Sequence, residues 1–204
     1  MARRLASITL DNLDELPHRC RRCVFWELEP ASRERTVGAD ASVAKEAWIS
    51  AVLLEWGSCG RIVYVDGVGA GYVLYAPPGY VPRSVAFPSS PVSPDAVLLM
   101  TALIRPEFAG GGLGRVLVQT VAKDLIERGV RAIEAFGDTR WSGPSCVLPT
   151  DYLRAVGFKT VRPHQRFPRL RLELKNTVSW REDVESALER LLAGMTPDVA
   201  LRPA

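Results

Sequence analysis

The sequence predicts a single α/β domain with a C-terminal helical appendage. Short runs rich in β-branched and aromatic residues alternate with longer segments in which apolar residues recur every three or four positions, the periods of strands and helices. A length of 204 residues fits one large domain and is enough to bury a core without disulfide bonds. No repeat or linker divides the chain. We therefore expect a domain over residues 1–176, with a helix and tail over residues 177–204 packed on it.

The N-terminal part is expected to hold one strand and one long helix. Apolar and polar residues alternate from Leu5 to Leu10, as in a strand, and an irregular segment covers residues 12–40. Ser42 is a suitable cap for the helix that follows, and Gly57 stands where a left-handed residue ends a helix. The apolar positions between them recur at fourfold spacing: Trp48, Val52 and Trp56.

A hairpin and a proline-rich loop come next. Two strands are expected at Arg61–Asp66 and Gly71–Ala76, and the dipeptide Asp66-Gly67 between them favours a tight hairpin turn. Residues 77–94 contain six prolines, which remove backbone donors and exclude a helix or a central strand. Loops of this length in a compact domain commonly carry function.

The most informative segment is a buried strand followed by glycines and a helix. Ala96–Ile104 is almost wholly apolar, as expected of a strand buried on both faces. The helix after it has a strict fourfold apolar spacing from Leu113 and ends at Gly129. Between strand and helix lie four glycines within five positions, at 110, 111, 112 and 114.

The C-terminal part alternates short elements. We expect strands at Val130–Phe136 and Phe167–Lys175 and a short helix at Asp151–Val156 between them. In the last strand charged residues alternate with leucines, which predicts one solvated face. The pattern Ser179–Glu182 is that of a capping box, and it predicts the start of an amphipathic helix over Trp180–Leu192.

The glycine run predicts an anion site. Without Cβ atoms, several backbone N–H groups can converge on a phosphate at the positive end of the helix dipole. A Walker loop would need Gly-Lys-Ser/Thr, whereas Gly112 is followed by Leu113-Gly114-Arg115. A dinucleotide fingerprint would need a third glycine three positions after the second and an earlier place in the fold.

The segment resembles the signature of the GCN5-related N-acetyltransferases (GNAT), Gln/Arg-x-x-Gly-x-Gly/Ala after a strand that often ends in Pro-Glu. Here Pro106-Glu107 precedes Ala109–Gly114, Arg115 continues the helix, and Val156-Gly157-Phe158 is similar to the closing helix, Gly-Phe and strand unit. The resemblance spans about Leu5 to Lys175. It implies an α/β fold with a mixed, mostly antiparallel central sheet flanked by helices.

The resemblance also implies acetyl-CoA as co-substrate and an amine, on a small molecule or a protein, as acceptor. The amine would attack the thioester carbonyl directly, with the enzyme supplying position and oxyanion stabilisation. The residues implied to bind the cofactor lie at the end of the buried strand and in the glycine segment: Ala102, Leu103, Ile104, Ala109, Gly110, Gly111, Gly112, Leu113, Gly114 and Arg115. No metal is expected.

Two departures from the family pattern concern binding and catalysis. Ala109 replaces the Gln or Arg, which removes a side chain from the anion site. Leu153 occupies the position at which many members have the Tyr that protonates the leaving thiolate, and Tyr152 is its neighbour, about 100° away on a helix. General acid and base therefore stay open. The candidates are Glu27, Glu55, Glu134, Cys146 and Tyr152.

The segment around Cys20 and Cys23 supports alternative hypotheses. Cys-x-x-Cys is half of a zinc site or a redox pair, which Cys59, Cys146, His18 or His164 would have to complete. We favour packing and acceptor binding, because Trp26 and Glu27 together can attract an ammonium group. The competing functions are a CoA-binding module with little catalysis and a thiol- or zinc-based regulator.

Composition excludes several classes of protein. The formal charge is only +3, and the arginines are scattered, so no nucleic-acid partner is expected. No apolar run reaches the roughly 18 residues of a membrane span, and Met1–Leu10 lacks the apolar stretch of a signal peptide. Four unevenly spaced cysteines indicate reduced thiols and a cytoplasmic location. The Trp180–Leu192 helix can pack on its own sheet or on a second copy, so a homodimer stays open.

Overall fold

The computed structural model describes residues 2–143 and 145–174. Within them eight strands form one sheet in the order β1-β2-β3-β4-β5-β8-β7, with β6 beside β5. The strands are β1 (Arg3–Ser7), β2 (Gly60–Val65), β3 (Val68–Ala76), β4 (Ala96–Ile104), β5 (Ala132–Asp138), β6 (Leu148–Pro149), β7 (Lys159–Arg162) and β8 (Arg169–Glu173). β5 is parallel to both β4 and β6, and the other neighbours are antiparallel. The expected mixed, mostly antiparallel sheet is confirmed.

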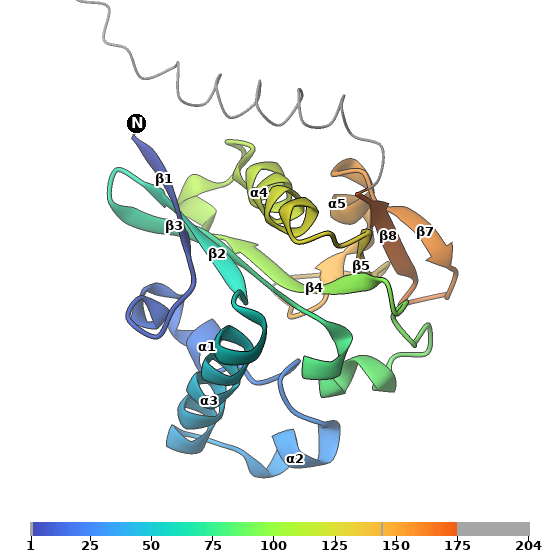
Figure 1. Ribbon diagram of the computed structural model, residues 1–204, viewed down its shortest axis with the longest axis horizontal. Coiled ribbons are helices and arrows are strands. Elements are labelled where there is room, and N and C mark those ends of the chain that lie inside the picture. The colour runs from blue at the N-terminus through green and yellow to red at the C-terminus, as the bar shows by residue number, and fades with distance from the viewer. Residues whose placement is uncertain (1, 144, 175–204) are drawn as a thin grey trace, which may run out of the picture.

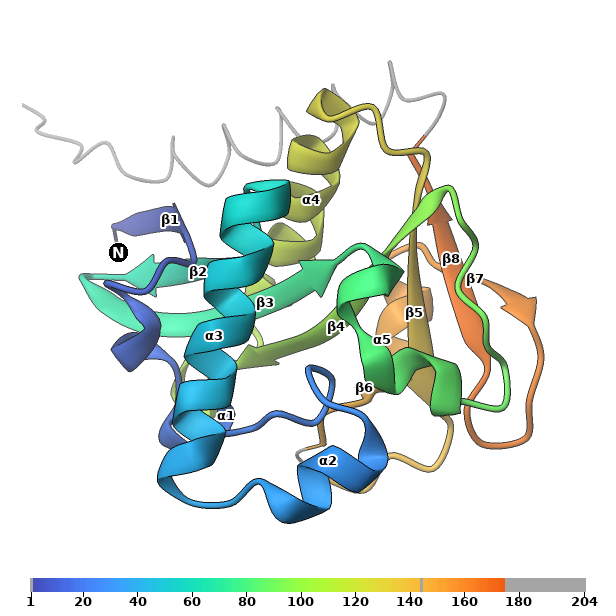
Figure 2. The same cartoon turned by 60° about the horizontal axis from the view of Figure 1, so that its bottom comes forward.

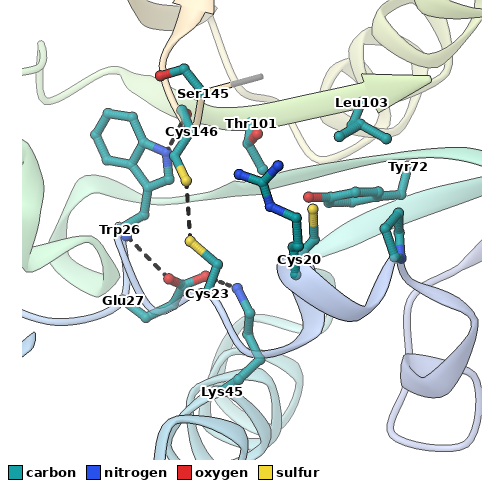
Figure 3. A pocket seen from close by; sticks show the side chains of 12 residues that line it. Cys20, Cys23, Trp26, Glu27, Lys45, Tyr72, Thr101, Leu103, Ser145 and Cys146 are labelled. Carbon is teal, nitrogen blue, oxygen red and sulfur yellow. Dashed lines mark hydrogen bonds and ion pairs between the residues drawn. The ribbon is translucent and has the colours of Figure 1, made fainter. Parts of the chain in front are cut away.

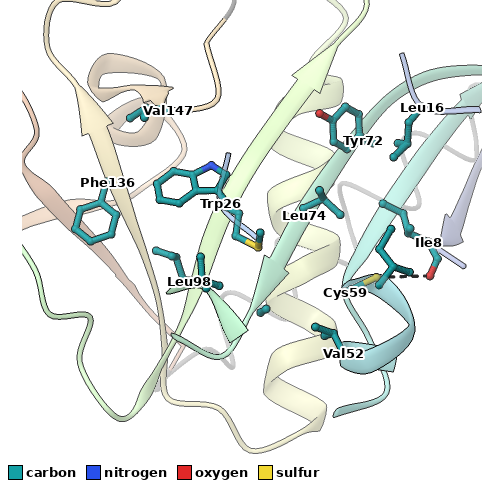
Figure 4. Packing of buried hydrophobic residues seen from close by; sticks show 14 of the residues in the cluster. Ile8, Leu16, Trp26, Val52, Cys59, Tyr72, Leu74, Leu98, Phe136 and Val147 are labelled. Carbon is teal, nitrogen blue, oxygen red and sulfur yellow. Dashed lines mark hydrogen bonds between the residues drawn. The ribbon is translucent and has the colours of Figure 1, made fainter. Parts of the chain in front are cut away.

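Helices cover both faces of this sheet (Figures 1 and 2). One face carries α1, α2 and α3 and the other carries α4 and α5. Their bounds are α1 (His18–Arg21), α2 (Pro30–Arg35), α3 (Ala39–Trp56), α4 (Leu113–Glu127) and α5 (Thr150–Ala155). Each face has its own hydrophobic cluster. The cluster on the α3 side includes Trp26, Val52 and Leu98 (Figure 4), and the cluster on the other side includes Leu117 and Leu153.

The first long helix differs from its sequence prediction in start and in face. It begins at Ala39 with Gly38 as its cap, at φ 61°, so Ser42 lies inside the first turn and does not cap it. The buried residues of α3 are Ala41, Lys45, Ile49 and Val52, a stripe rotated from the one expected through the tryptophans. The end of the helix is as predicted, with Gly57 in the left-handed conformation.

The hairpin is confirmed, and the proline-rich loop is partly ordered by short helices. Asp66 and Gly67 both have positive φ, 49° and 82°, and join β2 to β3 as a tight two-residue turn. The loop that follows contains two 3-10 helices, Pro78–Tyr80 and Pro82–Ala86, while the segment before α3 holds a third, Leu13–Glu15, besides α1 and α2.

β4 separates from β5 partway along its length. The two strands pair only at Ala96, Val97 and Leu98. On its other edge β4 stays paired with β3 to Ile104, but the register shifts by one residue so that Met100 has no partner. Such a bulge bends a strand and increases its twist. The edge of residues 99–104 that would face β5 is therefore open.

The predicted solvated face of β8 is wrong. Its leucines are buried as expected, but Arg169 and Arg171 on the other face are only 11% and 13% exposed. Both pair with Glu134 on the neighbouring strand β5, at 2.6 and 3.1 Å. The capping box at 179–182, the helix over 180–192 and the appendage 177–204 lie outside the described residues.

Within the part of the chain that is described, no helix combines the length and apolar character needed to cross a membrane.

Candidate active site

The glycine segment forms an exposed turn with free backbone donors. Gly110 and Gly112 have φ of 83° and 74°, and Gly112 is the N-cap of α4. Among the described residues, the N–H groups of Gly110, Gly111 and Gly112 have no backbone acceptor. The first turn of α4 adds further N–H groups that lack a partner within the helix. The arrangement suits a phosphate-sized anion.

Tyr152 fixes the start of α4 against α5. Its hydroxyl donates to the carbonyl of Gly114 at 2.9 Å, and a Cβ on Gly114 would lie only 3.1 Å from the tyrosine ring. Arg115 makes a second connection by donating to the carbonyl of Ala155 at 2.6 Å. Burial raises the pKa of Tyr152 to about 12. Leu153 is fully buried in the core, so its position offers no group to a substrate.

A pocket of ≈ 130 Å³ lies beside the open end of β4 (Figure 3). It is built by segments that are distant in sequence: α1 and the residues after it, α3, β3, β4 and the loop before β6. The lining residues are Pro17, Arg19, Cys20, Cys23, Trp26, Glu27, Lys45, Tyr72, Thr101, Leu103, Ser145 and Cys146. Thr101 and Leu103 come from the stretch of β4 that has left β5. The pocket therefore adjoins the open strand edge.

Glu27 lines this pocket, but its charge is neutralised. One carboxylate oxygen forms an ion pair with Lys45, and the other accepts a hydrogen bond from the N–H of Trp26 at 3.1 Å. Both side chains of the ion pair are 2% exposed. Trp26 is itself 2% exposed and stacks on Phe87. Because both oxygens of Glu27 already have partners, this carboxylate is not free to attract an ammonium group together with Trp26, as the sequence suggested.

Two cysteines meet in the pocket. The Sγ atoms of Cys23 and Cys146 are 3.1 Å apart, although 123 positions separate them in sequence. The hydrogen bond with Cys146 lowers the pKa of Cys23 to about 6, against the opposing effect of burial. The same contact, together with burial, raises the pKa of Cys146 well above its usual range. The direction of the two shifts favours deprotonation of Cys23 before Cys146.

The Cys-x-x-Cys spacing left a Cys20–Cys23 redox pair open as an alternative; in the structure the sulfur that Cys23 contacts is that of Cys146. Burial raises the pKa of Cys20, and a contact with Tyr72 offsets part of that rise. All four cysteines are free thiols. In residues 2–143 and 145–174, no three His, Cys, Asp or Glu side chains gather closely enough to hold a metal ion.

Glu134 and Glu55 have other partners. Glu134 is fully buried on β5 and is held by Arg169, Arg171 and the N–H of Ser93, at 2.6, 3.1 and 3.1 Å. It does not line the pocket, so we remove it from the general-base candidates. Glu55 accepts a hydrogen bond from the hydroxyl of Tyr80 at 2.7 Å, also outside the pocket.

Sequence reasoning missed Lys45, Tyr72 and Thr101 as pocket residues. A signal existed for one of them. Lys45 stands four positions from both Ala41 and Ile49 on the buried stripe of α3, where a cation needs a partner. Tyr72 and Thr101 lie inside apolar strands, and no local pattern marks them.

No model of a protein family matches the sequence, and no curated protein matches it. Solved structures do match. The Salmonella typhimurium protein yncA, assigned as an acetyltransferase and solved with acetyl-CoA, is 15% identical with a TM-score of 0.59, over 87% of this chain and 97% of that one. The PaiA N-acetyltransferase of Thermoplasma acidophilum, solved with coenzyme A, is 12% identical with a TM-score of 0.57, over 85% and 99%.

A protein of Desulfovibrio desulfuricans assigned to the GNAT family is 21% identical with a TM-score of 0.52, over 85% of this chain and 99% of that one. The chain has the GNAT fold. Within this fold, the glycine segment that starts α4 and the open edge of β4 lie next to each other, since only η4 (Pro106–Phe108) and a few residues separate them in sequence. The buried strand, the glycine segment and the helix thus follow one another in the order that the sequence predicts.

Proposed function

We propose that this protein is an acyl-CoA-dependent N-acyltransferase that moves acetyl from acetyl-CoA to a primary amine. The observation that carries the proposal is the row of N–H groups at Gly110, Gly111 and Gly112, which find no backbone acceptor within residues 2–143 and 145–174, beside the edge of β4 that no described strand pairs with. Two proteins of the same fold were solved with acetyl-CoA or coenzyme A, which supports the choice of ligand. The free amides and the open strand edge fit a long ligand with a diphosphate.

In this proposal the diphosphate binds the amides of Gly110–Gly114, and Ala102, Leu103 and Ile104 bind the pantetheine arm. No described residue has an atom within 4 Å of a Cβ added to Gly110 or Gly112, so this part of the structure leaves room for phosphate oxygens. Leu113 is buried and anchors the helix. The guanidinium of Arg115 already donates a hydrogen bond to the carbonyl of Ala155. Ala109 contributes only backbone.

The pocket would hold the amine. Direct attack on the thioester needs an uncharged amine, so a proton must leave first. A base works best when its pKa lies near the working pH. The thiolate of Cys23, hydrogen-bonded to Cys146, meets that condition, because its pKa is about 6. We assign proton removal to this pair and give Glu27 and Tyr152 positioning roles.

The test uses two matched glycines at the two ends of α4. Gly112 and Gly129 both have φ of 74° and nothing within 4 Å of an added Cβ, so leucine strains both alike. Gly112→Leu should weaken coenzyme A binding, measured by calorimetry, roughly 10- to 100-fold, as loss of a charge-assisted hydrogen bond does. Gly129→Leu should bind like the wild type. Equal affinity in both variants would contradict the proposal.

A second candidate function is a CoA-binding module with little catalysis. Ala109, which lacks the side chain of the family signature, and the buried Leu153 favour it. Release of free thiol from acetyl-CoA in the presence of pooled amines distinguishes the two functions. Turnover supports the transferase, and saturable binding without turnover supports the module.

We also propose a cytoplasmic location, since free thiols persist in a reducing compartment.

A further inference from the structure

The contact between Cys23 and Cys146 joins two walls of the pocket. Cys23 follows α1, and Cys146 lies in the loop before β6; Figure 3 shows their sulfur atoms facing each other. Their sulfur atoms are 3.1 Å apart. A disulfide bond is about 2.05 Å long, so the sulfurs need to approach by only about 1 Å. The two segments are already held together, because the indole N–H of Trp26 donates to the carbonyl of Cys146 at 2.8 Å.

The surroundings of the two thiols suit oxidation. Both cysteines are partly buried and line the pocket, so a small oxidant can reach them from solvent. Reaction with a peroxide needs a thiolate, and a second thiol within contact distance can then complete a disulfide. The charged groups that act on Cys23 are Glu27, which raises its pKa, and Lys45, which lowers it, and these two side chains form an ion pair with each other.

We propose that Cys23 and Cys146 are a peroxide-sensitive pair whose reversible disulfide closes the pocket and stops acyl transfer. The loss of activity rests on the proposed function, whereas the disulfide itself does not. The bond would tie the segment after α1 to the loop before β6 across the pocket, and it would remove the thiolate. A small-molecule dithiol or a cellular thiol reductant would reopen it.

The chemistry balances with hydrogen peroxide as the oxidant. The sulfur of Cys23 attacks one peroxide oxygen, so that an S–O bond forms, the O–O bond breaks and the departing hydroxide takes a proton to become water. The sulfur of Cys146 then attacks that of Cys23, an S–S bond forms and the S–O bond breaks. The released hydroxyl leaves as a second water with the proton of Cys146. Two thiols lose two electrons, and one peroxide gains them.

The other two cysteines provide internal controls. Cys59 is fully buried, its Sγ lies 3.9 Å from the carbonyl of Ile8, and burial raises its pKa to about 12. Cys20 lines the same pocket, but its raised pKa keeps it a thiol. Its hydrogen-bonding neighbour is the side chain of Tyr72. Both should stay reduced while the pair oxidises.

The experiment maps disulfides in the full-length protein. Reduced protein is treated with hydrogen peroxide at pH 7, quenched with N-ethylmaleimide in denaturant, digested and analysed by mass spectrometry. We expect one linked peptide pair that joins Cys23 to Cys146, with Cys20 and Cys59 alkylated. The link should persist in Cys20→Ser. In Cys146→Ser it should be replaced by a sulfenic acid on Cys23, which dimedone traps. A link between Cys20 and Cys23, or no link at all, would overturn the assignment.

Activity is measured on the same samples. Oxidation should abolish acetyl transfer and dithiothreitol should restore it, in step with the linked peptide. Full turnover by the linked protein would overturn the claim that the bond closes the pocket. If the link forms in a protein that never transfers acetyl groups, the proposed function fails and the redox site stands. If transfer occurs but the link never forms, the redox site fails alone.

Discussion

The glycine turn (residues 110–112) and the pocket that contains Cys23 and Cys146 both adjoin β4, but they are built from different parts of the chain. The turn offers backbone N–H groups from consecutive residues, and it needs only glycines and a helix start. The pocket offers side chains from five separate segments, paired across as many as 123 positions. A site of the first kind can be recognised in a sequence, whereas a site of the second kind depends on the finished fold.

The most severe test of the pocket concerns its buried ion pair. Glu27→Ala should lower the free energy of unfolding by about 3–5 kcal/mol, because Lys45 would be left buried without its counter-charge. Urea denaturation measures the change. The double variant Glu27→Gln with Lys45→Met should recover much of the loss. A loss below about 1 kcal/mol in the single variant would mean that the pair is solvated, as surface pairs are.

A second test asks whether Glu134 on β5 stabilises the fold or acts in catalysis. Glu134→Gln should lower the free energy of unfolding by about 1–3 kcal/mol, because Arg169 loses its carboxylate partner, while Arg171 keeps its ion pairs with Asp95 and Glu173. The pH dependence of turnover should stay that of the wild type, since Glu134 does not line the pocket. A shifted pH profile with unchanged stability would restore Glu134 as a catalytic base.

A third test addresses the two sulfurs directly. Cys146→Ala removes the hydrogen bond that lowers the pKa of Cys23 to about 6, so that pKa should rise toward the usual value of 9.0. A lowered pKa means more thiolate at neutral pH, so alkylation by iodoacetamide at pH 7 should be slower in the variant. Its rate as a function of pH gives the midpoint. An unchanged midpoint would show that some group other than Cys146 stabilises the thiolate.

The smallest effect is expected at the contact between the glycine turn and α5. Tyr152→Phe removes one hydrogen bond to the carbonyl of Gly114 and should cost about 0.5–1.5 kcal/mol of stability. Turnover should change little, because that hydroxyl is already occupied. A large fall in kcat with an unchanged KM for acetyl-CoA would instead identify Tyr152 as the general acid.

The contrast between the two regions also explains what the sequence could predict. The bounds of β4, the start of α4 and the hairpin turn at Asp66 and Gly67 follow from local patterns, and the structure confirms them. These features need only apolar runs, glycines and turn residues.

Where the sequence was least informative in the C-terminal sheet and the pocket, the partners meet only in space. The spacing of Cys20 and Cys23 suggested a local pair, but the fold brings Cys146 to Cys23. Arg169 and Arg171 alternate like a solvated face, yet Glu134 on the adjacent strand buries them in ion pairs. Periodicity gives the side of a strand on which a residue lies, and only the pairing of strands determines which side chain it meets.

Amide hydrogen exchange with and without coenzyme A, resolved residue by residue by NMR, shows whether the ligand lies along the glycine turn and β4. Coenzyme A should slow exchange at Gly110–Arg115 and at the amides of residues 99–104 that face the opening between β4 and β5. Exchange in β2, which is paired on both sides, should stay as it was. Bound coenzyme A that leaves the exchange at Gly110–Arg115 unchanged would contradict the account.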